Sequence, residues 1–105
     1  MSAPLSIDGY QAAAARTINA TLNDEQCLLD AAAGLAEEAG EVLSHVRKHV
    51  MQGRPLDRVA VTEELGDALW CIAVVAKTLG VSLSDVALAN VDKLRTRYPN
   101  GLASP

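Results

Sequence analysis

The sequence reads Glu-Glu-Ala-Gly-Glu-Val over residues 37–42 and Glu-Glu-Leu-Gly-Asp-Ala over residues 63–68. These two hexapeptides start 26 residues apart and hold six of the thirteen acidic residues of the chain. Side chains three or four positions apart are neighbours on an α-helix, with about 5–6 Å between their Cβ atoms. If both segments are helical, each therefore presents a pair of carboxylates on one face.

The composition around these motifs predicts an all-α protein. The 105 residues include eighteen Ala and fourteen Leu, whereas aromatic residues make up 3% and Phe is absent. Ala and Leu are strong helix formers, and the residue types that favour sheets are scarce. We expect one domain over residues 1–105, with its core at about 8–99 and a flexible tail at 100–105, because this length buries only one core. Small Ala faces bury little area, so we also expect an oligomer.

Turn and capping signals divide the chain into four predicted helices. Their expected limits are about residues 8–20, 24–51, 57–80 and 82–98. Asn23 and Gln26 have the spacing of a capping box at the start of the second helix. Gly80 is placed to end the third helix, and Ser82 with Asp85 marks the start of the fourth.

The paired carboxylates predict a metal site. Small residues such as Gly34 and Cys71 flank them, which indicates packing against another helix rather than open water. No Lys or Arg lies within residues 31–46 or 59–76 to balance the charge, and a carboxylate that leaves water needs a cation or a proton. Oxygen ligands without His or Cys favour Mg²⁺ or Mn²⁺ over zinc. The alternative is that these acids are simply solvated.

Two glycines support close contact between the acidic helices. Gly40 and Gly66 occupy matching places in the two hexapeptides, and a mid-helix Gly costs about 0.8–1.0 kcal/mol relative to Ala. This repeated cost predicts that the backbones of the two helices approach each other at these positions.

A polar and cationic stripe follows on the last predicted helix. Asn90, Lys93 and Arg97 recur at i, i+3 and i+7, and no acidic residue follows Asp92. Cations in the last turn of a helix are favourable because of the helix dipole alone, so the stripe has a purely structural explanation. The functional alternative is a phosphate clamp that faces the metal site.

Composition also excludes several classes of function. A net charge of −4 argues against nucleic acid as a partner. The longest apolar run, residues 68–76, is too short to span a bilayer, and residues 1–5 carry no signal-peptide pattern. We therefore expect a cytoplasmic protein with no membrane partner.

Five further residues receive a structural interpretation. Cys27 and Cys71 form no metal or disulfide pattern and are expected to be buried free thiols. Trp70 is expected in the core, and His45 and His49 are left out of the metal site.

Three motifs, in this order and spacing, resemble the MazG-like all-α nucleoside triphosphate pyrophosphohydrolases. They are Gly-Leu-Ala-Glu-Glu-Ala-Gly-Glu-Val (34–42), Glu-Leu-Gly-Asp-Ala-Leu-Trp (64–70) and Asn90-x-x-Lys93-x-x-x-Arg97-Tyr98-Pro99. Tyr10-Gln11 followed by Arg16-Thr17 also resembles the opening helix of short members of the family. The resemblance covers about residues 10–101 and implies a four-helix bundle whose helices pack across subunits.

The resemblance implies roles for the acidic residues. An E-x-x-E pair, here Glu38 with Glu41, and an E-x-x-D pair, here Glu64 with Asp67, would bind Mg²⁺. Glu37 matches an additional acid of the family pattern and would orient or deprotonate the attacking water.

The resemblance also implies a substrate and a reaction. Asn90, Lys93 and Arg97 would hold the triphosphate, with Lys48 as a weaker candidate. Family members cleave between the α and β phosphates and release a nucleoside monophosphate and pyrophosphate. They work as homodimers or homotetramers in which a neighbouring subunit completes the site.

Three functions are therefore to be distinguished. The first is hydrolysis of (deoxy)nucleoside triphosphates, as house-cleaning of non-standard or surplus nucleotides. The second is a catalytically silent helical module that binds nucleotide or metal. The third is a helical oligomerisation domain whose acids only decorate its surface.

Overall fold

The computed structural model describes residues 4–101, which form four α-helices and no strands. The helices are α1 (Ile7–Ala15), α2 (Asp24–Gln52), α3 (Arg58–Thr78) and α4 (Leu83–Arg97). The all-α prediction is therefore confirmed. The predicted tail lies mostly outside the described residues, although Gly101 N still donates a hydrogen bond to Tyr98 O over 2.9 Å.

The predicted capping signals fix most helix ends. Asn23 and Gln26 form the capping box at the start of α2, and Ser82 accepts a hydrogen bond from Asp85 N at the start of α4. Gly53 and Gly80 have φ values of 67° and 74°, a left-handed conformation that favours glycine after a helix. These limits agree with the sequence prediction to within two residues.

The end of α1 differs from the prediction. The helix stops at Ala15 rather than near Ala20. Thr17 Oγ1 donates to Ala14 O over 2.7 Å, and Asn19 Oδ1 accepts from Thr21 N over 3.0 Å. Short polar side chains that bond the nearby backbone compete with helical hydrogen bonds, which explains the early stop.

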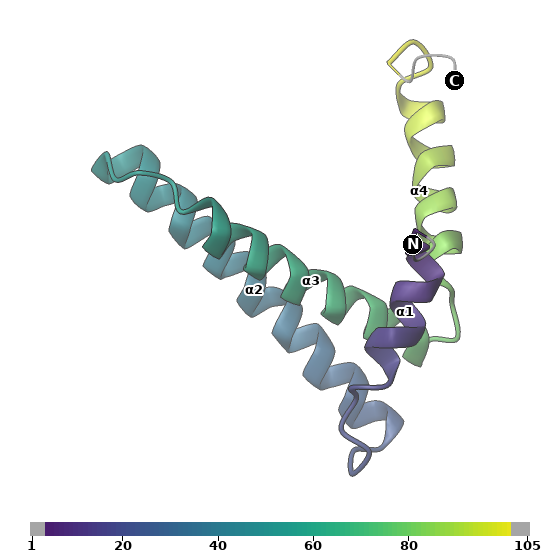
Figure 1. Ribbon diagram of the computed structural model, residues 1–105. Helices are drawn as coiled ribbons and strands as arrows, with labels where there is room; N and C mark the ends of the chain where they lie inside the picture. The colour runs from purple at the N-terminus through teal and green to yellow at the C-terminus, as the bar shows by residue number, and fades with distance from the viewer. Residues whose placement is uncertain (1–3, 102–105) are drawn as a thin grey trace.

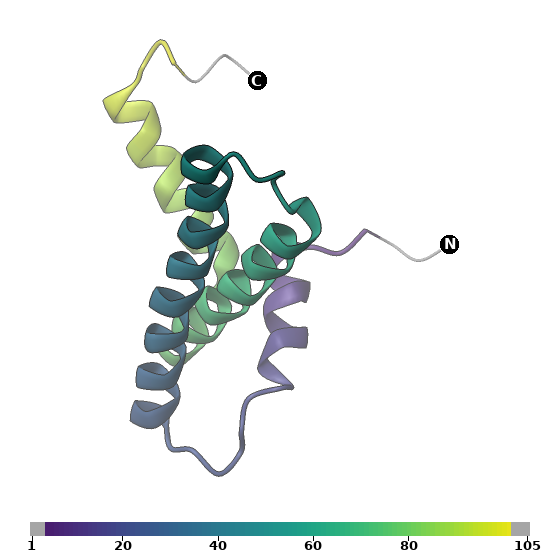
Figure 2. The ribbon, with the colours of Figure 1, turned by 90° about the vertical axis from the view of Figure 1, so that its left-hand side faces the viewer.

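The arrangement of the helices is an antiparallel hairpin with two additions. Helices α2 and α3 lie side by side along their lengths, and α1 packs against the C-terminal half of α3 (Figures 1 and 2). Helix α4 leaves α3 at an angle of 100° and projects away from the hairpin (Figure 1). Within residues 4–101, α4 contacts α1 and α3 but not α2. One chain thus does not close its helices into the expected four-helix bundle.

The core is small because it is built mainly from alanine. Ala14, Ala73, Ala76 and Leu83 form its buried centre, where α1, α3 and α4 meet. Trp70 packs against this cluster from its edge instead of filling the core, and its Nε1 donates to Thr17 Oγ1 over 2.7 Å. Many larger apolar side chains remain exposed, among them Leu43, Val50, Met51, Val59 and Leu65.

Gly34 is the glycine of α2 that lies directly against α3. A Cβ atom there would lie 2.9 Å from Cys71 Sγ, whereas nothing lies within 4 Å of a Cβ built at Gly40 or Gly66. The predicted backbone contact at Gly40 and Gly66 is therefore wrong within one chain. Gly34 takes this role because it faces the buried thiol of Cys71, and Cys27 and Cys71 are both buried and free as expected.

We expect Gly34→Ala to destabilise the protein by about 1–3 kcal/mol, because a methyl group inserted into a filled contact displaces its neighbours. Urea unfolding of the metal-free protein would measure this change. Adding Cys71→Ala should restore most of the loss, since it removes the sulfur atom in the way.

Gly40→Ala is the matched control for this prediction. It makes the same change where space is open and should stabilise α2 by about 0.5–1 kcal/mol. Equal losses at both positions would contradict the assigned contact.

No single helix among residues 4–101 is both long and apolar enough to cross a membrane. Helices α3 and α4 reach the length and apolar composition of a membrane-spanning segment only when they are taken together, as a pair bent by 100°.

Candidate metal centre

Three carboxylates converge between α2 and α3. Glu38 and Glu41 lie one turn apart on α2, and the antiparallel packing brings Glu64 of α3 against them. One oxygen from each of the three groups lies within 4.8 Å of the others. This spacing is small enough for a single cation to contact all three, and we call these residues the acidic cluster.

Two oxygens of the acidic cluster lack partners. Glu38 Oε2 and Glu64 Oε2 are buried, and neither has a hydrogen-bond partner among the described residues. A buried carboxylate oxygen without a partner is costly and requires an explanation. A cation bound at this point would satisfy both atoms, and an all-carboxylate donor set suits Mg²⁺ or Mn²⁺.

The close approach of the carboxyl groups shifts the titration of Glu41 and Glu64. The pKa of Glu41 is raised above its ordinary value of 4.5, first by the hydrogen bond that its protonated form can make with Glu64 and then by the charge of Glu64. The pKa of Glu64 is raised chiefly by the hydrogen bond that its protonated form can make with Glu38, although its interaction with Glu41 acts in the opposite direction. His45 lies close enough to lower the pKa of Glu41 slightly against these effects.

Asp67 and Glu37 lie at the margin of the cluster. Asp67 follows Glu64 by one helical turn and is exposed, and its charge raises the pKa values of Glu41 and Glu64. Its carboxylate oxygens are nevertheless not among those that lie within 4.8 Å of one another. Glu37 is exposed on α2 beside Glu38.

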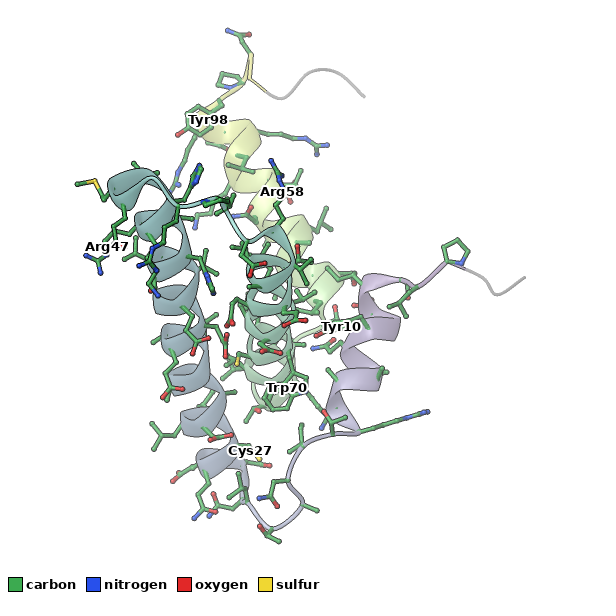
Figure 3. The ribbon with its side chains drawn as sticks, turned by 60° about the vertical axis from the view of Figure 1, so that its left-hand side comes forward. Tyr10, Cys27, Arg47, Arg58, Trp70 and Tyr98 are labelled. Atoms are coloured by element: carbon green, nitrogen blue, oxygen red, sulfur yellow. The ribbon has the colours of Figure 1, made fainter. Side chains whose placement is uncertain are left out.

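Cys71 and Tyr10, to which the sequence assigned no role in the site, respond to its charges. Burial raises the pKa of the Cys71 thiol, and the charges of Glu38, Asp30 and Asp67 add to this effect. Burial also raises the pKa of Tyr10, with a contribution from Asp67. Figure 3 shows Tyr10 on α1 facing the side of α3 that carries Trp70. The place of Cys71 beside the carboxylates follows from its i+4 spacing from Asp67, whereas no local pattern predicts that Tyr10 of α1 lies here.

The cationic stripe lies elsewhere in the chain. Asn90, Lys93 and Arg97 are exposed along α4, where Lys93 and Arg97 line a shallow groove with Asp92 and Thr96. Because α4 does not contact α2, one chain does not bring the stripe onto the acidic cluster.

The basic residues at the tip of the hairpin also lie apart from the cluster. Lys48 is exposed near the C-terminal end of α2, two turns beyond Glu41. His49 Nδ1 is 2.6 Å from Arg54 O, which ties it to the loop after α2. Arg47 and Arg58 mark this end of the hairpin in Figure 3.

The raised pKa values predict how stability depends on pH. A carboxyl group whose pKa is raised by folding stabilises the native state below its unfolded pKa, and this contribution is lost as pH rises through the folded pKa. The metal-free protein should therefore lose thermal stability as pH rises from about 4.5. Differential scanning calorimetry would measure the change.

Two observations would check the cause of this loss. The loss should be smaller in Glu64→Gln, which removes one charge of the cluster. Added Mg²⁺ should reverse the trend, because protons and cations compete for the same oxygens. Asp8 has the opposite effect on stability at lower pH. Hydrogen bonds from Ser84 lower its pKa below 3.8, so its stabilising contribution is lost as pH falls.

Comparison with known proteins gives a consistent picture. Residues 26–102 match the family described as MazG nucleotide pyrophosphohydrolase domain. The Gene 37 protein of Mycobacterium phage L5 is 38% identical over 76 residues, which cover 66% of this chain and 64% of the phage protein. The uncharacterized protein YvdC of Bacillus subtilis (strain 168) is 37% identical over 73 residues, which cover 61% of this chain and 69% of that protein. The matched part of the chain thus spans less than two thirds of the phage protein. No solved structure matches.

Proposed function

The chain belongs to the MazG nucleotide pyrophosphohydrolase domain family, and on this basis we propose that it is an Mg²⁺-dependent nucleoside triphosphate pyrophosphohydrolase. It would hydrolyse a (d)NTP to a (d)NMP and pyrophosphate, with one water molecule consumed for each bond broken between the α and β phosphates. Removal of non-standard or surplus nucleotides is the proposed role.

The observation that carries this proposal is the acidic cluster with its two unpartnered oxygens. Glu38, Glu41 and Glu64 supply converging carboxylates, and the buried Oε2 atoms of Glu38 and Glu64 have no partner among the described residues. We assign Mg²⁺ to this point, with Mn²⁺ as a substitute and Asp67 as a fourth ligand. The bound ion would act as a Lewis acid on phosphoryl oxygens and lower the pKa of nearby water.

The other proposed roles belong to side chains around the cluster. Glu37 would orient the attacking water and accept its proton. Asn90, Lys93 and Arg97 would bind the phosphate oxygens and stabilise the negative charge that builds up as the bond breaks. Lys48, at the end of α2, is a further candidate for contact with the phosphates.

We propose that a second copy of the chain brings the stripe to the cluster. Helix α4 projects away from its own hairpin, and exposed Leu43, Val50 and Leu65 on the hairpin provide an apolar surface. A homodimer or a homotetramer would cover this surface and place one chain's α4 near the other's acidic cluster. The proposed setting is the cytoplasm, without a nucleic-acid or membrane partner.

The experiment that tests this function is a panel of standard and damaged (d)NTPs incubated with Mg²⁺ and separated by chromatography. Monophosphate and pyrophosphate, both absent when EDTA is added, are the expected products. Diphosphate and phosphate would mean that a different bond is cleaved. Triphosphate binding in calorimetry without any product would instead support the catalytically silent module.

A further inference from the structure

The start of α4 is held by side chains from the other end of the chain. The first three N–H groups of a helix have no partner within the helix, and in α4 each of them meets a side chain. Leu83 N donates to Gln11 Oε1 over 3.1 Å, Ser84 N to Asp8 Oδ1 over 2.9 Å, and Asp85 N to Ser82 Oγ over 3.1 Å. Only the last of these acceptors is local, because Asp8 and Gln11 belong to α1.

Gln11 and Asp8 each make further hydrogen bonds at this point. Gln11 Nε2 donates to Val81 O over 3.0 Å and to Ala73 O over 3.3 Å, so one side chain joins α3, the α3–α4 turn and α4. Asp8 Oδ2 accepts a hydrogen bond from Ser84 Oγ over 2.6 Å. We call this set of hydrogen bonds the α4 joint.

Little else in the described chain fixes the direction of α4. Leu83 is its only buried residue, and the rest of the helix projects away from the hairpin after a bend of 100° from α3 (Figure 1). Its contacts within residues 4–101 are with α1 and α3 alone. The direction of α4 therefore depends on the α4 joint and on the packing of one buried side chain, Leu83.

A small change at the joint has a large effect at the far end of α4. Arg97 is fourteen residues beyond Leu83, which corresponds to about 21 Å along the helix at a rise of 1.5 Å per residue. A change of about 10° in direction would move Arg97 by roughly 3–4 Å. This displacement is larger than the length of a hydrogen bond between a guanidinium group and a phosphate oxygen.

We infer that Asp8 and Gln11 are positioning residues, which set the direction of α4 and thereby place Lys93 and Arg97 against the triphosphate. The inference rests on the proposed function, because it needs the cationic stripe to bind substrate. Asp8 and Gln11 make no hydrogen bond to the acidic cluster within the described residues, and their role is assigned through α4.

The test compares Asp8→Ala and Gln11→Leu with two matched variants. Asp8→Asn keeps an oxygen that accepts from Ser84 N. It replaces the second oxygen with an NH₂ group that can donate to Ser84 Oγ, so it should behave like the wild type. Ala12→Gly destabilises α1 at an exposed position without removing any hydrogen bond of the joint.

Steady-state kinetics with a hydrolysed triphosphate gives the first measurement. Asp8→Ala and Gln11→Leu should raise KM by about tenfold and change kcat by less than about threefold. The Mg²⁺ concentration that gives half-maximal activity should not change, because the acidic cluster is untouched. If Ala12→Gly raises KM equally, or if Asp8→Asn fails to restore it, the positioning role is wrong.

A distance measurement tests the joint independently of activity. Nitroxide labels at Ala33→Cys on α2 and Arg95→Cys on α4, in protein diluted with unlabelled chains, would report the distance between the two helices within one chain. Asp8→Ala and Gln11→Leu should broaden or shift this distance distribution, whereas Ala12→Gly should not. An unchanged distribution overturns the inference. If no triphosphate is hydrolysed, the proposed function fails while this measurement still decides the role of the joint.

Discussion

Glu64→Gln is expected to reduce triphosphate hydrolysis by about 10³-fold or more, which corresponds to about 4 kcal/mol of lost transition-state stabilisation. Glu64 is the one member of the acidic cluster that α3 supplies, so its loss leaves the proposed ion with Glu38 and Glu41 of α2 and only the marginal Asp67 of α3. Glu41→Gln should have a similar effect, because it removes one of the two α2 ligands. Initial rates at saturating Mg²⁺ would measure both losses.

The same substitutions should have the opposite effect on the metal-free protein. Glutamine removes one negative charge from a crowded group and adds an amide that can donate to the unpartnered Glu38 Oε2. The melting temperature without Mg²⁺ should therefore rise in Glu64→Gln. Added Mg²⁺ should stabilise the wild type by mass action but not the variant.

Glu63→Gln is the matched control, since it removes the same charge from the adjacent, exposed position of α3. It should keep nearly full activity and a normal response to Mg²⁺. If Glu63→Gln loses as much activity as Glu64→Gln, then overall charge rather than a metal site controls the reaction. Full activity in both Glu64→Gln and Glu41→Gln would exclude the proposed ligands.

The sequence was sufficient to predict the helices because their ends depend on local chemistry. The capping box of Asn23 with Gln26, the Ser82 cap and the left-handed Gly80 all act within a few residues. Similarly, the i, i+3 spacing of Glu38 and Glu41 is a property of one helix. The early end of α1 was missed because Thr17 and Asn19 bond the backbone in a way that periodicity does not reveal.

Contacts between helices were harder to predict. Gly34 and Gly40 are both mid-helix glycines of α2, but only Gly34 faces a filled contact, with Cys71. Which of them does so depends on how α2 and α3 are rotated against each other, and a single sequence does not fix that rotation. The α4 joint depends on Asp8 and Gln11, more than 70 residues away from Leu83 and Ser84 in sequence, and such pairing leaves no local pattern.

The separation of the cationic stripe from the acidic cluster leads to the second large effect, which is complementation between two inactive variants. Lys93→Ala/Arg97→Ala should lower kcat/KM by about 10²–10³-fold, because it removes both cations proposed to bind the phosphates. In a dimer whose sites combine α4 of one chain with the acidic cluster of the other, a mixed dimer of this variant with Glu64→Gln has one intact site. Random mixing should then restore about a quarter of the wild-type activity.

Mixing Glu64→Gln with Glu41→Gln provides the control. Both changes lie in the acidic cluster, so every site of a mixed dimer retains one of them and no activity should return. Mixed oligomers isolated through two different affinity tags would show that exchange took place in both cases. If isolated mixed oligomers of Lys93→Ala/Arg97→Ala with Glu64→Gln remain inactive, each chain uses its own α4. The helix would then have to swing from its present direction toward its own hairpin, a movement that the hydrogen bonds of Asp8 and Gln11 at its base oppose.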